Sequence, residues 1–167
     1  MTGDAFFGPV VGIDPGLTGA VALVSGDGRA VSVDDMPVVT KGKGGHDLDL
    51  PALRDLLRDL APERVYVERQ QARPGNGACA AHTAGRIYGA ILGILTALEL
   101  PYELVTPQRW KKAMLDGEPK DDSNPKAPSL RVARRLFPLV DLGRRKDAGR
   151  AEALLIAEWG RRAGGAG

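Results

Sequence analysis

Short apolar runs separated by glycine-containing turns fill the first 35 residues. Val10–Ile13 is apolar and rich in β-branched residues, which predicts a buried strand. Gly19–Val24 predicts a second strand, which pairs with the first as a hairpin across the turn at Asp14–Gly16. Arg29–Asp34 alternates polar and apolar residues, which predicts a third strand with one solvent-exposed face. This part of the chain therefore predicts an antiparallel meander.

The following residues switch to helical spacing. Asp49 is suited to cap a helix that has Pro51 in its first turn, and leucines at 53, 56, 57 and 60 form its apolar stripe. We expect further helices over 78–99, 107–115, 129–137 and 148–161, and strands at Val65–Val67 and Tyr102–Val105. Residues 40–45 and 117–128 predict loops, the second of them mobile, and residues 162–167 predict a flexible tail.

This order of elements predicts an α/β fold in a single domain over residues 1–167. Three strands form the meander, and two more strands, each reached through a helix, add to it in parallel. The expected result is a five-stranded mixed sheet flanked by helices. Such a sheet matches the ribonuclease H-like arrangement.

Composition narrows the class of protein. Hydrophobic residues make up 43% and charged residues 26%, as in ordinary globular proteins. Cys79 is the single cysteine, so an internal disulfide and a multi-cysteine zinc site are excluded, and a cytoplasmic setting is expected. The longest uncharged apolar run, Ile87–Leu98, has 12 residues. A spanning helix needs about 20, so no membrane association is expected.

Charge is unevenly distributed. The net charge is only +2, but the residues after position 100 carry 14 Lys and Arg against 9 Asp and Glu. This excess suits a polyanionic partner, and it also suits an ordinary solvated surface.

Four acids occupy positions suited to metal chemistry. Asp14 and Glu68 each end a predicted strand, and Asp147 and Glu152 lie near the start of the last helix. Carboxylates gathered from strand ends and a helix hold Mg²⁺ well, and two such ions can drive phosphodiester hydrolysis. Each acid also has an ordinary explanation, as a turn residue, a surface ion pair or a favourable charge at a helix start.

Several motifs together resemble the RuvC-type Holliday-junction resolvases, in particular their shorter phage and prophage branch. The resemblance covers about residues 10–160. The matching segments are Gly12–Ala20, Tyr66–Glu68, Val105–Lys112, Leu136–Pro138 before Arg144–Lys146, and Gly149–Leu154.

The resemblance implies a homodimeric, Mg²⁺-dependent endonuclease with a ribonuclease H-like fold. Such an enzyme nicks two opposed strands of a four-way DNA junction, with Mn²⁺ as a substitute metal, in a bacterial or phage-infected cell. Asp14, Glu68 and Glu152 match the acids of the family. The alternatives are another ribonuclease H-like nuclease and a junction-binding protein that does not cleave. The chain is too short for a sugar kinase, whose first phosphate loop Asp14–Thr18 also resembles.

The fourth acid departs from the family pattern. Ala148 stands where relatives often have an acid, and Asp147 precedes it. Positions four apart share a helix face, whereas positions five apart diverge by about 140°. Either Asp147 is the fourth ligand from outside the helix, or the site has three carboxylates. An inactivating substitution at Ala148 is a further explanation.

Candidate DNA contacts flank these motifs. Near the scissile strand, the loop after Glu68 lacks the aromatic wedge of some relatives. Lysines and arginines give salt-sensitive affinity for phosphates, although any one of these residues also suits a solvated surface. The candidates are Gln70, Gln71, Arg73, Arg109, Lys111, Lys112, Arg145 and Lys146.

Three glycines lie four residues apart in the long helix over 78–99. Gly85, Gly89 and Gly93 share one face, where each costs about 1 kcal/mol relative to alanine. This spacing indicates close approach of another backbone. In the resembled family this helix helps to form the dimer, so these residues are candidates for the subunit interface.

Overall fold

The five predicted strands form one mixed sheet. In the computed structural model, which describes residues 8–70, 75 and 77–164, the strand order is β3-β2-β1-β6-β7. β1 pairs antiparallel with β2 and parallel with β6, which confirms the meander and the added parallel strands. The strands are β1 (Val10–Asp14), β2 (Ala20–Val24), β3 (Ala30–Asp35), β6 (Arg64–Glu68) and β7 (Tyr102–Val105).

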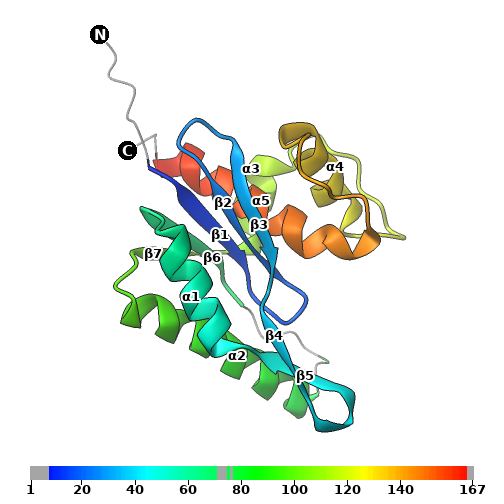
Figure 1. The fold of residues 1–167 in the computed structure, drawn as a ribbon. Helices are drawn as coiled ribbons and strands as arrows, with labels where there is room; N and C mark the ends of the chain where they lie inside the picture. Colours follow the sequence, from blue (N-terminus) through cyan, green and yellow to red (C-terminus); the bar gives the residue numbers. More distant parts are fainter. Residues whose placement is uncertain (1–7, 71–74, 76, 165–167) are drawn as a thin grey trace.

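Helices cover both faces of this sheet (Figure 1). On one face, α3, α4 and α5 pack with alternate strand residues into one apolar core. On the other face, α1 and α2 pack with the remaining strand residues into a second core. The helices are α1 (Leu50–Leu60), α2 (Ala78–Ala97), α3 (Pro107–Met114), α4 (Ala127–Leu136) and α5 (Ala148–Gly164).

Glycines let α5 lie directly against β1. A Cβ at Gly12 would stand 2.2 Å from the Ala153 carbonyl oxygen, so no side chain fits there. A Cβ at Gly160 of α5 would likewise meet the Tyr66 ring of β6 at 2.1 Å. Because the backbones of α5 and β1 are so close at Gly12, the residues of α5 beside Ala153 lie next to the carboxyl end of β1.

The start of α1 follows the sequence prediction. Asp49 Oδ1 accepts a hydrogen bond from the Ala52 N–H at 3.0 Å, which caps the helix and confirms the predicted start. Leu53 and Leu57 are fully buried against the sheet. The amphipathic stripe therefore anchors α1 on the second core.

Residues 40–45, which the sequence predicts as a loop, belong to a hairpin. β4 (Val38–Lys41) and β5 (Gly45–Leu48) pair antiparallel around a 3-10 turn η1 (Gly42–Gly44). The prediction failed here because every residue from Val38 to His46 is exposed. No buried face imposes an alternating pattern on such strands.

Two predicted boundaries also shift. α4 begins at Ala127, so the loop predicted to reach residue 128 ends at Lys126. Glu118 in this loop pairs with Arg131 and Arg135 of α4. The predicted mobility of the loop stays a prediction. α5 continues to Gly164, whereas a flexible tail was expected from residue 162, and residues 165–167 lie outside the described part.

Candidate active site

Three of the four predicted acids come together at one edge of the sheet. Asp14 and Glu68 end the neighbouring parallel strands β1 and β6, in which Ile13 pairs with Val67. Glu152 comes from α5, which lies on β1, and is only 1% exposed. Parallel strands end at the same edge, so residues 54 positions apart meet there.

Glu68 is held in place by a tryptophan. Trp110 is fully buried in α3, and its Nε1–H donates to Glu68 Oε2 at 2.6 Å. α3 is positioned by Thr106, whose hydroxyl oxygen accepts from the Arg109 N–H. Nothing in the sequence spacing around Trp110 reveals this hydrogen bond.

Two lysines pair with Glu152. Lys111 Nζ lies 3.3 Å from Glu152 Oε1, and Lys126 Nζ contacts Oε2. The Ser129 hydroxyl donates to Oε1 at 3.5 Å. Lys126 and Ser129 were missed as site residues, since they come from the end of a proline-rich loop and the first turn of α4. Only the folding of α4 onto α5 brings them to the acids.

The pKa values of Asp14, Glu68 and Lys126 are all raised, which indicates an excess of negative charge at the site. Burial, and then the neighbouring Glu152, raise the pKa of Asp14 to about 8, although Lys126 and Lys111 act against this rise. Burial also raises the pKa of Glu68, against the Trp110 hydrogen bond. Burial would lower the pKa of Lys126, but Glu152, Asp14 and Glu68 together raise it. The cluster therefore favours additional positive charge.

The donor set suits a hard divalent cation. Carboxylate oxygens from three elements are the ligands that Mg²⁺ and Mn²⁺ prefer. In the part of the chain that the structure describes, no three His, Cys, Asp or Glu side chains converge as a ready metal centre. The oxygens of Glu152 instead face Lys111 and Lys126. The three acids therefore fit a divalent ion by the chemistry of their oxygen donors.

Asp147 is not among the acids that the structure gathers. It ends the 3-10 turn η2 (Arg145–Asp147), where Oδ2 accepts from the Arg144 N–H at 2.8 Å. The Arg144 side chain donates to Oδ1, and this hydrogen bond lowers the pKa of Asp147. Its carboxylate therefore caps η2 and is engaged by Arg144, and the structure does not bring it together with the other three acids. Ala148 begins α5, one turn before Glu152.

The candidate DNA contacts are scattered. Lys111 pairs with Glu152 in the acidic cluster. Gln70 Nε2 donates at 3.1 Å to the carbonyl oxygen of Pro15, the residue that follows Asp14. Arg109 stacks 4.9 Å above the Trp159 ring and pairs with Glu103. The remaining candidates are Lys112 and Lys146, which are exposed, Arg145, which lies in η2, and Gln71 and Arg73, which fall outside the described residues.

The three helix glycines face open space. No described residue lies within 4 Å of a Cβ built at Gly85, Gly89 or Gly93. Within the described part of one subunit, no other element therefore packs closely against these glycines.

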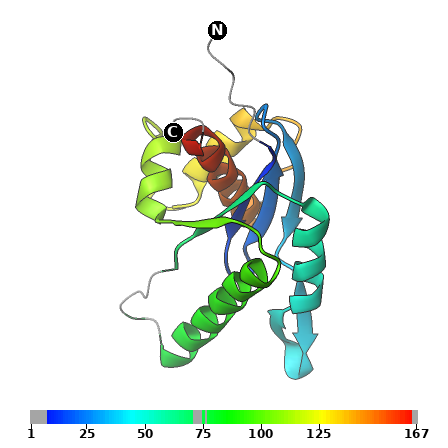
Figure 2. The same cartoon turned by 90° about the vertical axis from the view of Figure 1, so that its left-hand side faces the viewer.

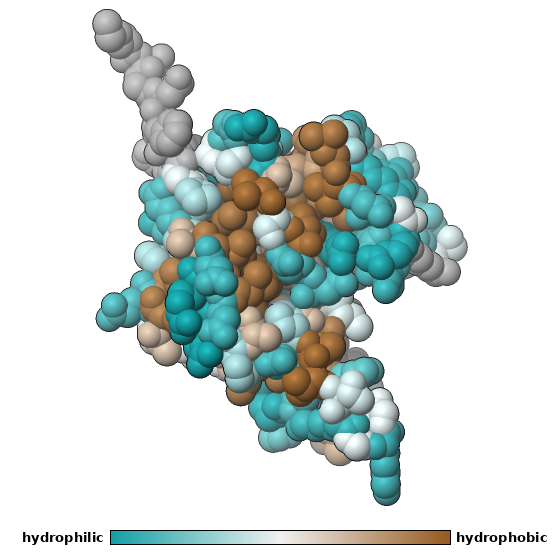
Figure 3. Space-filling model, viewed as in Figure 1, coloured by the Kyte–Doolittle hydropathy of each residue, from teal (hydrophilic) through white to brown (hydrophobic). Residues whose placement is uncertain are grey.

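A separate apolar hollow of about 570 Å³ lies between β3 and residues 136–141. Figure 3 shows the apolar surface that gathers over this side of the molecule. Val31 and Leu139, at its rim, are 62% and 99% exposed. The hollow contains none of the three gathered acids and is distinct from the candidate site.

Ionised Asp14 is expected to cost stability. Its folded pKa of about 8 exceeds the ordinary value of 3.8, so the folded state holds the proton more tightly and stability falls as pH rises between these values. Asp14→Asn should therefore melt above the wild type at pH 8 in EDTA, and the gap should shrink at pH 5. Each kcal/mol corresponds to about 2–4 °C, which calorimetry resolves.

Asp35→Asn is the matched control, because Arg150 lowers the pKa of Asp35 through a hydrogen bond at 2.6 Å. Loss of the Asp35 carboxylate in Asp35→Asn should lower the melting temperature at neutral pH. A decrease for both variants would contradict the assignment of excess negative charge to Asp14.

Sequence comparison gives one relevant relative. No protein-family model matches the chain. Over 97 residues it is 39% identical to the chloroplastic Holliday junction resolvase MOC1 of Chlamydomonas reinhardtii. This match covers 56% of the chain but spans only about a tenth (10%) of the length of that relative.

Solved structures share the fold over nearly the whole chain. RuvC of T. thermophilus in complex with a Holliday junction substrate superposes with a TM-score of 0.69 and 22% identity, covering 94% of this chain and 96% of that one. The yeast mitochondrial Holliday junction resolvase Ydc2 gives a TM-score of 0.53 and 13% identity, with 96% and 82% covered. The chain therefore has the ribonuclease H-like fold of RuvC.

Proposed function

We propose that this chain is a RuvC-type Holliday-junction resolvase, a metal-dependent endonuclease that nicks opposed strands of a four-way DNA junction. The observation that carries this proposal is the gathering of Asp14, Glu68 and Glu152 at one edge of a RuvC-like sheet. The similarity to a curated junction resolvase supports it independently of the fold.

Asp14, Glu68 and Glu152 would hold the divalent cations, with Mg²⁺ preferred and Mn²⁺ as a substitute. Such ions, when bound, activate a water molecule and stabilise the leaving oxygen of a phosphodiester. The Trp110 N–H keeps Glu68 oriented. Lys111 and Lys126 restrain Glu152 and bring positive charge to the edge where the DNA phosphate must approach.

We also propose that α2 forms a homodimer interface. α2 is long and apolar enough to cross a membrane by length and composition, yet only Ile87, Ile91 and Leu95 are buried. A second copy of the chain would cover this exposed surface, and the open glycine face lets two helices approach closely. Two identical sites would then act on two opposed strands.

A synthetic four-way junction, end-labelled on each arm, tests the proposed activity. We expect paired symmetric nicks that require Mg²⁺ or Mn²⁺, and no comparable cutting of linear duplex DNA or of an RNA–DNA hybrid. Equal cutting of the hybrid would identify a different nuclease of the same fold. Equal affinity for duplex and junction would overturn the proposal.

One observation favours the non-cleaving alternative. Asp147 is engaged by Arg144, and position 148 has no acid, so three carboxylates meet among the residues that the structure describes. Tight junction binding without nicks in any divalent metal would support a structural junction binder.

The dimer proposal predicts a clean effect at Gly89. Because nothing lies within 4 Å of its Cβ, Gly89→Glu leaves the single subunit intact while placing a charge in the expected interface. We expect sedimentation velocity to show a monomer at concentrations where the wild type is a dimer.

Ala113→Glu, at an exposed position of α3, is the control and should stay dimeric. An unchanged dimer for Gly89→Glu would place the interface elsewhere.

A further inference from the structure

The β4–β5 hairpin leaves the sheet at the edge that carries the acids. Ala20 of β2 pairs with Asp14 on one side and with Asp35 on the other, so β1 and β3 end level with each other. β4 follows β3 after two residues and extends beyond that edge. Figures 1 and 2 show the hairpin and the first half of α2 projecting from the same end of the molecule.

One ion pair fixes this hairpin to α2, and a second joins its two strands at the base. Asp47 of β5 is 7% exposed, and its Oδ1 accepts from Arg86 of α2 at 2.5 Å. Its Oδ2 pairs with Lys41 of β4. Arg86 first and then Lys41 hold the pKa of Asp47 far below its usual range. The hairpin is thus braced at its base on both sides.

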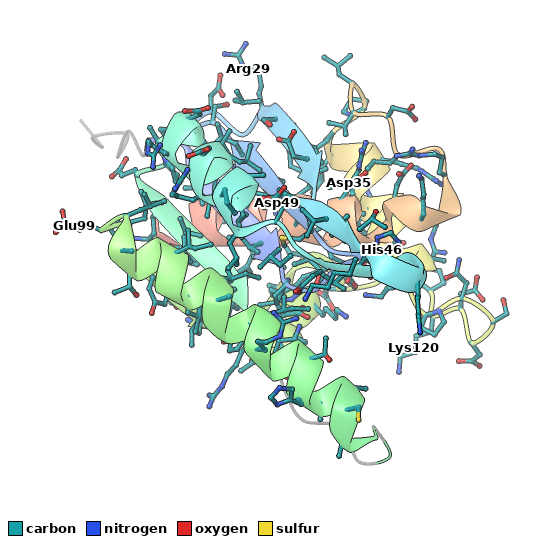
Figure 4. All side chains as sticks on the ribbon, turned by 60° about the horizontal axis from the view of Figure 1, so that its bottom comes forward. Arg29, Asp35, His46, Asp49, Glu99 and Lys120 are labelled. Carbon is teal, nitrogen blue, oxygen red and sulfur yellow. The ribbon has the colours of Figure 1, made fainter. Side chains whose placement is uncertain are left out.

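The tip beyond this brace carries a lysine and lacks apolar side chains. Residues 42–46 read Gly-Lys-Gly-Gly-His, contain no acid, and are all exposed. Lys43 stands at the turn with a φ of 63°, among three glycines. Figure 4 labels His46 on this projecting segment. The tip therefore presents charge and bare backbone on a narrow two-stranded ribbon.

We propose that this tip binds backbone phosphates of a DNA arm, as a contact separate from the acidic site. The inference rests on the proposed junction substrate. Glycines allow close backbone approach to phosphate, lysine supplies the charge, and a two-stranded ribbon fits the major groove. Protein interface cores are depleted in lysine, so a protein partner fits these residues less well.

Lys43→Gln tests the contact, because Lys43 lies beyond the brace formed by Asp47. Junction affinity is measured across a salt series. We expect binding to weaken severalfold and the slope of log affinity against log salt to fall by about 0.9, the value for one lost phosphate contact. Lys43→Glu should weaken binding further than Lys43→Gln, because it replaces the positive charge with a negative one.

Arg54→Gln, an exposed charge on α1 paired with Asp55, is the control and should leave the salt slope unchanged. If Lys43→Gln leaves the salt slope unchanged while the wild-type protein still nicks junctions, the proposed hairpin contact is wrong and the proposed nuclease activity stands. A change of oligomeric state instead would assign the tip to a subunit interface. Loss of junction preference in the wild type itself would overturn both proposals.

Discussion

Glu152→Gln is expected to abolish metal-dependent cutting of a four-way junction. Glu152 is buried between Lys111 and Lys126 and belongs to the acid cluster through its effect on Asp14. A catalytic metal ion contributes several kcal/mol, and each 1.36 kcal/mol is tenfold in rate. We therefore expect the single-turnover nicking rate to fall by about 1,000-fold or more, while gel-shift affinity for the junction persists.

Glu158→Gln provides the matched control on the same helix. Glu158 is also buried, but it pairs with Arg161 and Arg162, away from the other acids. Its loss should lower the melting temperature and leave nicking close to the wild-type rate. Comparable loss of nicking in both variants would show that Glu152 acts through the stability of α5 alone.

Ala148→Asp is expected to strengthen metal use. Position 148 starts α5 and lies four residues before Glu152, on the same helix face. A carboxylate there adds an oxygen donor to the cluster and also suits the positive end of the helix dipole. We expect the Mg²⁺ concentration for half-maximal nicking to fall by about tenfold, equivalent to about 1.4 kcal/mol.

Ala148→Asn separates charge from size at this position. It should leave the metal requirement near that of the wild type. An unchanged or higher Mg²⁺ requirement for Ala148→Asp would mean that three carboxylates already complete the site.

Local sequence patterns were sufficient to predict the five-stranded sheet and the positions of two of its acids. Buried strands made β1 and β6 recognisable, and the residue that ends such a strand is placed by the strand itself, as with Asp14 and Glu68. Glu152 was predicted from its place near the start of the last helix and from its match to an acid of the resembled family. Each of these positions follows from its own element.

Contacts between distant elements could not be predicted in this way. Lys126 reaches Glu152 only because α4 packs on α5. The sequence left open whether Asp147 is a fourth ligand, and the motif does not show that the guanidinium of Arg144, three residues earlier, pairs with its carboxylate. The hairpin was missed because exposed strands carry no hydrophobic alternation.

The close contact at Gly12 limits how this protein can change during evolution. Any larger residue there would have to push the Ala153 backbone away, and Glu152 would move with it. Gly149 is similarly confined, since a Cβ there would stand 2.5 Å from the Thr18 carbonyl oxygen. At these two positions only a hydrogen atom fits as the side chain, so a substitution that disturbs the core there would also displace an acid of the candidate site.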